Sequence, residues 1–170
     1  MIITKVQEVL LLFSLILAFI LNPFPTQAKE SSQLLFEKAL QESKKGDFIQ
    51  AKKDWDLFLT ENPNNAAGLS NRGNILLALG YPEAAIRDQT KAIEISPNDL
   101  DSYLNRGIAE EALQHWEAAF RDYNSVLEGN PDDFSALYNL GNVMGSMGNW
   151  AEAKKYFAKA SLSGNIIAMA

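Results

Sequence analysis

The sequence contains no cysteine and only one histidine, His115. Without cysteine the chain can form neither a disulfide framework nor a thiolate metal site, and it offers no thiol for lipid attachment. No cluster of metal-ligand residues and no glycine-rich phosphate loop occurs either. We therefore expect no metal and no cofactor, and stability has to come from the packing of apolar side chains.

Basic residues are the minority among the charged side chains. The chain has 15 Lys and Arg against 21 Asp and Glu, which gives a formal net charge of −6 at pH 7. Nucleic acids and anionic lipid surfaces attract basic patches, so neither suits this composition. We expect no nucleic-acid binding and no membrane insertion of the mature chain.

The main positive feature of the chain is a period of 34 residues, with copies of one unit over 32–65, 66–99, 100–133 and 134–167. A glycine at position 8 of the unit, alanine in the first copy, and an alanine at position 20 are predicted to meet where two antiparallel helices cross, because only small residues let two backbones approach closely. Each unit is therefore predicted to be a helical hairpin. The recurring residues are Gly73, Gly107 and Gly141; Ala51, Ala85, Ala119 and Ala153; and Pro63, Pro97 and Pro131.

This period, and the order small residue, alanine, aromatic and proline, resemble the tetratricopeptide repeat (TPR) family. The resemblance implies an all-α fold, a right-handed α-solenoid of four tandem 34-residue helix-turn-helix hairpins, in one domain spanning residues 29–170. It also implies that the first helices of the hairpins line a concave groove. The segments that carry the resemblance are Asn71–Gly73, Asn105–Gly107, Asn139–Gly141, Trp116–Tyr123 and Trp150–Phe157.

The turns carry residues suited to starting and ending helices. Asn or Asp precedes the first helix of units 2 to 4, where its side-chain oxygen can accept a hydrogen bond from a free N–H group. Glycine is expected to end the first helix of units 1, 2 and 4 in the left-handed conformation, whereas unit 3 has Gln114 there. The expected caps are Asn65, Asp99 and Asp133, and the turn glycines are Gly46, Gly80 and Gly148.

Residues 1–28 are typical of a secretory signal peptide. One lysine, Lys5, precedes an apolar stretch from Val9 to Leu21, and Thr26-Gln27-Ala28 follows two prolines. The stretch has about 13 apolar residues, whereas a membrane-spanning helix needs about 20. We predict cleavage after Ala28; the alternative is an uncleaved membrane anchor.

A Sec-type signal would place the mature protein in the periplasm or the thylakoid lumen, and the sequence does not separate the two. The run from Arg121 through Tyr156, together with the signal, is similar to small lumenal TPR proteins of cyanobacteria and plastids. That weaker resemblance implies an association with thylakoid biogenesis or photosystem upkeep.

Two positions of the repeat change together. Position 7 is cationic and position 23 is aspartate in units 1 to 3, and in unit 4 both become non-ionic, as Leu140 and Tyr156. This covariation predicts an ion pair between the two helices of one hairpin; the alternative is two unrelated solvated charges. Such pairs fix geometry more than they add stability, because desolvation offsets most of the Coulomb gain. The predicted pairs are Lys38 with Asp54, Arg72 with Asp88, and Arg106 with Asp122.

Positions 2, 5, 6, 9, 12 and 13 share one face of the first helix, and several of them carry asparagine. A carboxamide offers both a donor and an acceptor, which suits a peptide backbone without requiring a particular side chain. We predict that a protein partner binds there through an extended segment; the alternative is that the asparagines make local helix contacts. The predicted groove residues are Asn71, Asn74, Asn105, Ile108, Tyr138, Asn139 and Asn142.

The other residues of this face set the expected ligand class. Phe36, Leu40 and Leu104 offer apolar contacts, and Asp101 and Glu111 are acidic, so a neutral or basic segment would suit the face. One TPR subtype uses lysines and an arginine of the groove to bind the C-terminal carboxylate of cytosolic chaperones, whereas positions 2 and 5 of this chain carry no cation. That subtype is therefore not expected.

No catalytic residues are predicted, and the chain is expected not to be an enzyme. His115 lies in a turn beside Trp116, and no nucleophile, base and orienting group can be assembled around it. Glu110 and Glu111 cannot face one point, because adjacent residues diverge by about 100° around a helix.

The sequence thus predicts an exported scaffold that binds a polypeptide in its groove. The alternative function is a structural assembly subunit, because repeat arrays usually finish with a polar capping helix and this chain has none. Asn165 replaces the usual proline, and the next first helix is expected to stop after about three residues. The apolar end would then dock on a partner or on a second copy, or the chain is a shortened form of a longer array.

Overall fold

The computed structural model describes residues 25–168, which form a series of helices without any strand in that range. The closest contacts join consecutive helices in pairs, so each unit is a helical hairpin and the all-α prediction is confirmed. The helices are α2 (Pro25–Lys45), α3 (Phe48–Glu61), α4 (Ala66–Ala78), α5 (Pro82–Ile95), α6 (Leu100–Ala112), α7 (Trp116–Gly129), α8 (Phe134–Ser146) and α9 (Trp150–Ala168).

The start of the array differs from the predicted start. The predicted signal peptide, residues 1–28, lies outside the described residues except for its last four, which begin α2. This helix starts at Pro25, ahead of the predicted unit boundary at Ser32, and continues through Ala28. The first helices of units 2 to 4 begin at the predicted residues Ala66, Leu100 and Phe134.

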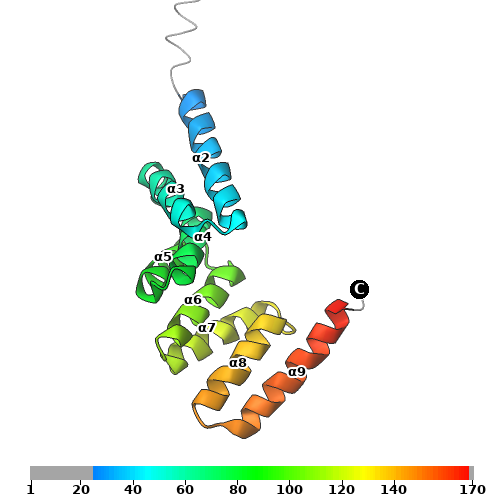
Figure 1. The fold of residues 1–170 in the computed structure, drawn as a ribbon. Coiled ribbons are helices and arrows are strands. Elements are labelled where there is room, and N and C mark those ends of the chain that lie inside the picture. The colour runs from blue at the N-terminus through cyan, green and yellow to red at the C-terminus, as the bar shows by residue number, and fades with distance from the viewer. Residues whose placement is uncertain (1–24, 169–170) are drawn as a thin grey trace, which may run out of the picture.

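The first helices of the hairpins lie along the inside of a curved array. Each first helix contacts the first helix of the next unit, whereas no such contact joins the second helices of neighbouring units within residues 25–168. The array therefore bends toward its first helices. Figure 1 shows the successive hairpins turning along this curve from α2 to α9.

The predicted helix caps form at two of three positions. The side chains of Asn65 and Asp133 accept hydrogen bonds of 2.8 Å and 2.9 Å from the backbone N–H three residues later. Asp99 makes no such bond, because its carboxylate accepts a hydrogen bond of 2.6 Å from Ser102 Oγ instead. The expectation for Asp99 was therefore wrong.

The turn glycines adopt the left-handed conformation that was predicted for them. Gly46, Gly80 and Gly148 have φ of 79°, 81° and 80°. Gln114 takes the same place in unit 3 with φ of 60°, and it is the one non-glycine residue with positive φ in the described part of the chain. A side chain with a Cβ is strained in this region, so unit 3 stores strain that the other units avoid.

The glycines at position 8 face a side chain of the second helix. A Cβ built on Gly107 would lie 2.6 Å from Tyr123 Cε1, so the missing methyl group makes room for the ring. The nearest side chain therefore belongs to position 24, one helical turn beyond the predicted alanine at position 20, which is itself buried in every unit. The same contact pairs Gly73 with Gln89 and Gly141 with Phe157.

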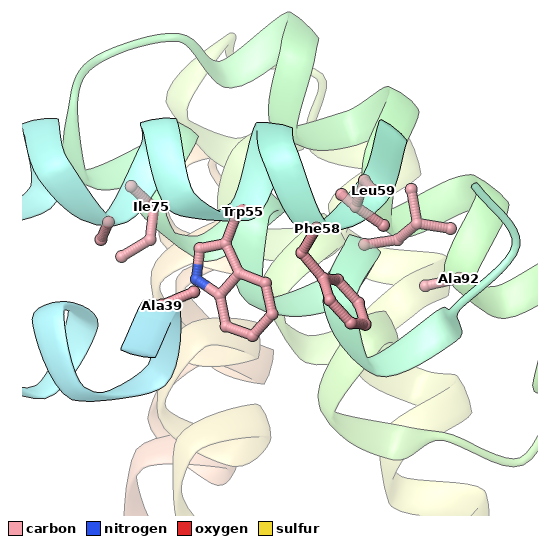
Figure 2. Close-up of a cluster of buried hydrophobic side chains, with 8 residues drawn as sticks. Ala39, Trp55, Phe58, Leu59, Ile75 and Ala92 are labelled. Carbon is pink, nitrogen blue, oxygen red and sulfur yellow. The ribbon is translucent and has the colours of Figure 1, made fainter. Parts of the chain in front are cut away.

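Unit 1 builds this contact from an alanine and a tryptophan, both fully buried. The Trp55 ring lies edge-on to Phe36 and Phe58, with centroids 5.0 Å and 5.8 Å away. Figure 2 shows the Trp55 and Phe58 rings side by side, with Ala39 next to the indole. The same apolar cluster includes Ile75 of unit 2, so the core continues across the boundary between units.

A second apolar cluster joins units 3 and 4. Tyr123 and Val126 of α7 pack with Ala136, Leu140 and Val143 of α8, and all five residues are buried. Neighbouring hairpins thus bury one another's faces, as repeat arrays do.

The last helix is longer than predicted. Helix α9 runs from Trp150 to Ala168 without a break at Asn165, so the expected turn and short new helix were wrong. No proline stands there to stop the helix, which continues through Gly164 and Asn165. Among the described helices, none is both long enough and apolar enough to cross a lipid bilayer.

Replacing Gln114 by glycine is expected to stabilise the protein by about 1 kcal/mol, because glycine adopts positive φ at no steric cost. Urea unfolding followed by circular dichroism measures the change. The matched control is Gly80→Gln, which introduces the same strain at the equivalent turn of unit 2 and should lower stability by a similar amount. An unchanged unfolding midpoint in Gln114→Gly would contradict the strain at this turn.

Candidate functional site

Arginine and aspartate side chains clamp the two helices of units 2 and 3 together. Arg72 donates from Nε and Nη2 to the two carboxylate oxygens of Asp88, at 2.7 Å and 2.8 Å. Arg106 binds Asp122 in the same two-pronged manner, at 2.9 Å and 2.7 Å. Both aspartates are buried, so these are ion pairs with fixed geometry and not separate solvated charges.

Each of these arginines also reaches the preceding unit. Arg72 Nη1 donates to Asp56 Oδ1 at 2.9 Å, and Arg106 Nη1 donates to Thr90 Oγ1 at 3.2 Å. The hydrogen bonds from Arg72, first to Asp88 and then to Asp56, raise the pKa of its guanidinium above the ordinary value. These contacts were not predicted from the sequence, although both partners are polar residues at position 25 of their units.

Unit 1 has a weaker version of the clamp. Lys38 Nζ lies 2.8 Å from Asp54 Oδ1, and Gln50 Nε2 donates to the same oxygen at 3.1 Å. The second oxygen, Oδ2, is buried and has no hydrogen-bond partner. An ammonium group makes one directed contact here where a guanidinium would make two.

The predicted groove residues lie on the inner side of the array, along the first helices α4, α6 and α8. Positions 2, 6, 9 and 13 of these helices are exposed or half-buried, and they form one face of each helix. Asn74 and Tyr138 are exposed, and the other predicted binding residues are half-buried. These others are Asn71, Asn105, Ile108, Asn139 and Asn142.

The two asparagines of α4 have partners within the chain. Asn71 Nδ2 donates to the carbonyl of Ala67 at 2.8 Å, which is a local helix contact of the kind left open as the alternative role. Asn74 Oδ1 accepts a hydrogen bond of 2.8 Å from Nε2 of Gln89, a fully buried residue of α5. Gln89 was missed because it occupies position 24, which the other units fill with aromatic residues.

A tyrosine reaches the groove in unit 3. The Tyr123 hydroxyl donates to Glu111 Oε2 at 2.8 Å. Burial, followed by the negative charge of Glu111, raises the pKa of Tyr123 well above its usual range, and a hydrogen bond with Asn139 opposes part of the rise. The phenol is therefore a protonated donor at every physiological pH. Ile108 packs against the same apolar cluster as Tyr123, which explains its partial burial.

Aromatic rings surround the groove in unit 4. The Tyr138 ring stacks on Phe134 at a centroid distance of 6.0 Å and lies tilted against Phe157 at 5.5 Å. Beside them is a shallow hollow of about 400 Å³. Its lining residues are Gly141, Asn142, Gly145, Ser146, Trp150 and Phe157.

The last hairpin exposes two aromatic side chains. Position 24 is fully buried in Trp55, Gln89 and Tyr123 of the earlier units, whereas Phe157 is 38% exposed. The tryptophan at the start of α9, Trp150, is 72% exposed. The repeat pattern predicted an uncovered apolar end but did not indicate these two side chains.

The only histidine makes a surface contact. His115 Nδ1 lies 2.7 Å from Glu110 Oε2 in an exposed turn. Glu111 points away from this pair toward Tyr123, as expected for adjacent residues of a helix. In the described part of the chain no three His, Asp or Glu side chains gather in a way that could hold a metal ion.

Comparison with known proteins finds the tetratricopeptide repeat in two segments. The family models match residues 66–99, which coincide with the predicted second unit, and residues 123–155, which run from α7 into α9. The comparison with curated proteins gives no match.

Solved structures are similar over most of the chain. A crystal structure of MamA is 26% identical with a TM-score of 0.68, covering 72% of this chain and 71% of that one. The first TPR domain of Spaghetti (RPAP3), bound to the HSP90 peptide SRMEEVD, is 27% identical with a TM-score of 0.67, covering 70% and 94%. A tetratricopeptide repeat protein from Parabacteroides merdae is 28% identical with a TM-score of 0.68, covering 76% and 52%.

Lys38→Arg is expected to raise the free energy of unfolding by about 1 kcal/mol, because a guanidinium can donate to both oxygens of Asp54 and pair the buried Oδ2. Thermal unfolding followed by circular dichroism measures the gain. The control is Lys45→Arg, which alters an exposed lysine paired with Glu42 on the same helix. A gain no larger than that of the control would show that the unpaired oxygen is not a source of instability.

Proposed function

Because the chain is a tetratricopeptide-repeat protein, we propose that it is an interaction scaffold that binds an extended polypeptide segment in its concave groove. The repeat fold itself supports a role in protein–protein interaction. The observation that carries the proposal is the row of asparagines that runs along the inner helices of three consecutive units. This row comprises Asn71, Asn74, Asn105, Asn139 and Asn142.

The asparagine row suits a peptide main chain. An extended segment presents N–H and C=O groups at regular intervals, and a carboxamide carries an acceptor for the first and donors for the second. Asn105 and Asn142 have no side-chain hydrogen bond to any described residue, so both remain free for a ligand. The half-buried Leu104 and the exposed Tyr138 add apolar contact area beside them.

The charges of the inner face favour a neutral or basic segment. Glu37 and Asp101 are exposed on it, and Glu111 is half-buried with its carboxylate at Tyr123. Positions 2 and 5 carry no cation in any of the four units. We therefore propose a ligand class different from the acidic peptide SRMEEVD that is bound to the RPAP3 domain.

We further propose that the protein acts after export, in the periplasm or the thylakoid lumen. This rests on residues 1–28, whose basic start, apolar stretch and Thr26-Gln27-Ala28 end are typical of a secretory signal. Lack of cysteine is compatible with an oxidising compartment. A protein that stays at full length in the cytosol would contradict this part of the proposal.

A second candidate function is assembly through the last hairpin. It is favoured by the exposed Trp150 and Phe157, because the position of Phe157 is fully buried in the other three units. Exposed aromatic side chains of this size are typical of protein interfaces. Docking of a partner protein or of a second copy would cover them.

Changing Asn71, Asn105 and Asn139 together to alanine is expected to reduce capture of the partner at least about tenfold, the effect of losing about 1.4 kcal/mol of binding free energy. The measurement is a crosslinking pull-down from the exported fraction. Asn64→Ala with Asn98→Ala, which alters exposed turn amides, is the control and should capture normally. Unaltered capture by a folded triple variant would remove the groove hypothesis.

Trp150→Glu tests the assembly function. If copies associate through the last hairpin, sedimentation velocity will show a concentration-dependent oligomer in the wild type and a monomer in this variant. Ile49→Glu alters an equally accessible apolar residue far from that hairpin and should leave the oligomer intact. A wild type that is monomeric at all concentrations and keeps its heterologous partners in Trp150→Glu would exclude assembly through this surface.

A further inference from the structure

Unit 2 differs from the other units in having a glutamine at position 24. We propose that buried Gln89 fixes the orientation of the Asn74 carboxamide, so that Asn74 presents its donors to the ligand. Together with Asn71, which presents its acceptor, it gives α4 a fixed pair of hydrogen-bonding groups. This inference rests on the proposed binding of a polypeptide main chain. It assigns to unit 2 the role of setting the register of that main chain, with Gln89 as a positioning residue that the ligand does not touch.

The orientation of Gln89 is set by a backbone carbonyl. Its side chain is fully buried, and Nε2 lies 3.0 Å from the carbonyl oxygen of Ser70. A carbonyl oxygen only accepts hydrogen bonds, so the atom of Gln89 that faces it has to be the amide nitrogen. The amide oxygen Oε1 consequently points elsewhere, and it has no hydrogen-bond partner.

The orientation of Asn74 follows from that of Gln89. The same Nε2 lies 2.8 Å from Asn74 Oδ1. Because Nε2 can only donate, Asn74 has to turn its oxygen toward the protein. Its NH₂ group, with two donors, is left for the exposed side of the helix, where Asn74 lies.

Asn71 is fixed in the opposite sense. Its Nδ2 donates to the carbonyl oxygen of Ala67 at 2.8 Å, and this carbonyl, like that of Ser70, tolerates only a donor. The Asn71 oxygen is therefore the atom that remains for a ligand. Since residues three apart are neighbours on a helix surface, an acceptor and a donor stand side by side.

This arrangement matches the main chain of an extended peptide, which offers one N–H donor and one C=O acceptor per residue. Asn71 Oδ1 would accept from the N–H, and Asn74 Nδ2 would donate to the C=O. The exposed residues on either side along the same face are Ala67 and Ala78, whose small side chains let a backbone approach.

No other unit combines these features. Units 1 and 3 have Leu40 and Ile108 at position 9, so they carry no amide there, and the Phe157 ring of unit 4 has no group that could donate to one. Asn142, the position-9 asparagine of unit 4, has no side-chain hydrogen bond to a described residue and can present either end. At position 9 the orientation of the carboxamide is thus fixed in unit 2 and adaptable in unit 4.

Two substitutions that change the charge equally distinguish donor from acceptor. Asn74→Asp replaces the exposed NH₂ donors by an acceptor oxygen, whereas Asn71→Asp keeps an acceptor at the ligand side. The probe is a capped peptide selected on the wild type from a displayed library of random sequences. We expect Asn74→Asp to weaken binding about tenfold more than Asn71→Asp, equivalent to about 1.4 kcal/mol.

Gln89→Leu tests the positioning role. Leucine fills the space without donating, so Asn74 can rotate, and the difference between Asn74→Asp and Asn71→Asp should shrink to about threefold or less in this background. A residue that only supports the fold would leave that difference unchanged. A second measurement uses the wild type and does not depend on the folding of a variant. Hydrogen exchange measured by NMR should be slow for the Gln89 side-chain amide and fast for that of Asn74.

The outcomes separate this inference from the proposed function. If a selected peptide binds and the two aspartate variants are weakened equally, the fixed polarity is wrong while groove binding stands. Fast exchange of the Gln89 amide in the wild type would likewise overturn the inference alone. If the wild type selects no peptide, or if selected peptides bind equally well to an Asn71→Ala, Asn74→Ala double variant, the proposed function fails together with the inference.

Discussion

Each hairpin depends on one contact, between a small residue at position 8 of the first helix and a large side chain at position 24 of the second. A methyl group on Gly107 would overlap the Tyr123 ring, so the absence of a side chain in one helix sets how closely the other can approach. The same contact decides what reaches the groove. In unit 2 the position-24 residue, Gln89, donates a hydrogen bond from its amide to Asn74. In unit 3 the position-24 residue, Tyr123, donates one from its hydroxyl to Glu111. The residue at position 24 therefore determines both the packing of its hairpin and the polar contact at the groove.

The ion pairs extend this logic from one hairpin to the next. Arg72 follows Asp56 and precedes Asp88 by the same interval, and it binds both. One side chain thus closes its own hairpin and holds the preceding one. Such a partly buried charge contributes mainly by permitting a single arrangement, because desolvation offsets much of its attraction.

Much of this architecture could be predicted by comparing the copies within the chain. The starts of α4, α6 and α8 follow from the period, and the joint loss of charge at Leu140 and Tyr156 pointed to the pairs seen in the other units. The period could not show which large side chain fills the space beside position 8, because that depends on how the two helices cross. It also could not show which end of an amide faces the groove, since that depends on where the carbonyl of Ser70 lies. Helix α9 was misjudged at Asn165 because a unit boundary was expected where no residue interrupts the helix.

The boundaries between units differ in chemistry, and this has a consequence for how the array comes apart. Both terminal boundaries contain an apolar cluster, but that between units 1 and 2 adds the partly exposed contact of Arg72 with Asp56. Cooling weakens apolar contacts at either end, whereas salt screens only the charged one. In a linear array whose stability is a sum of neighbour terms, concentrated salt therefore favours fraying of the amino-terminal hairpin over the carboxy-terminal one.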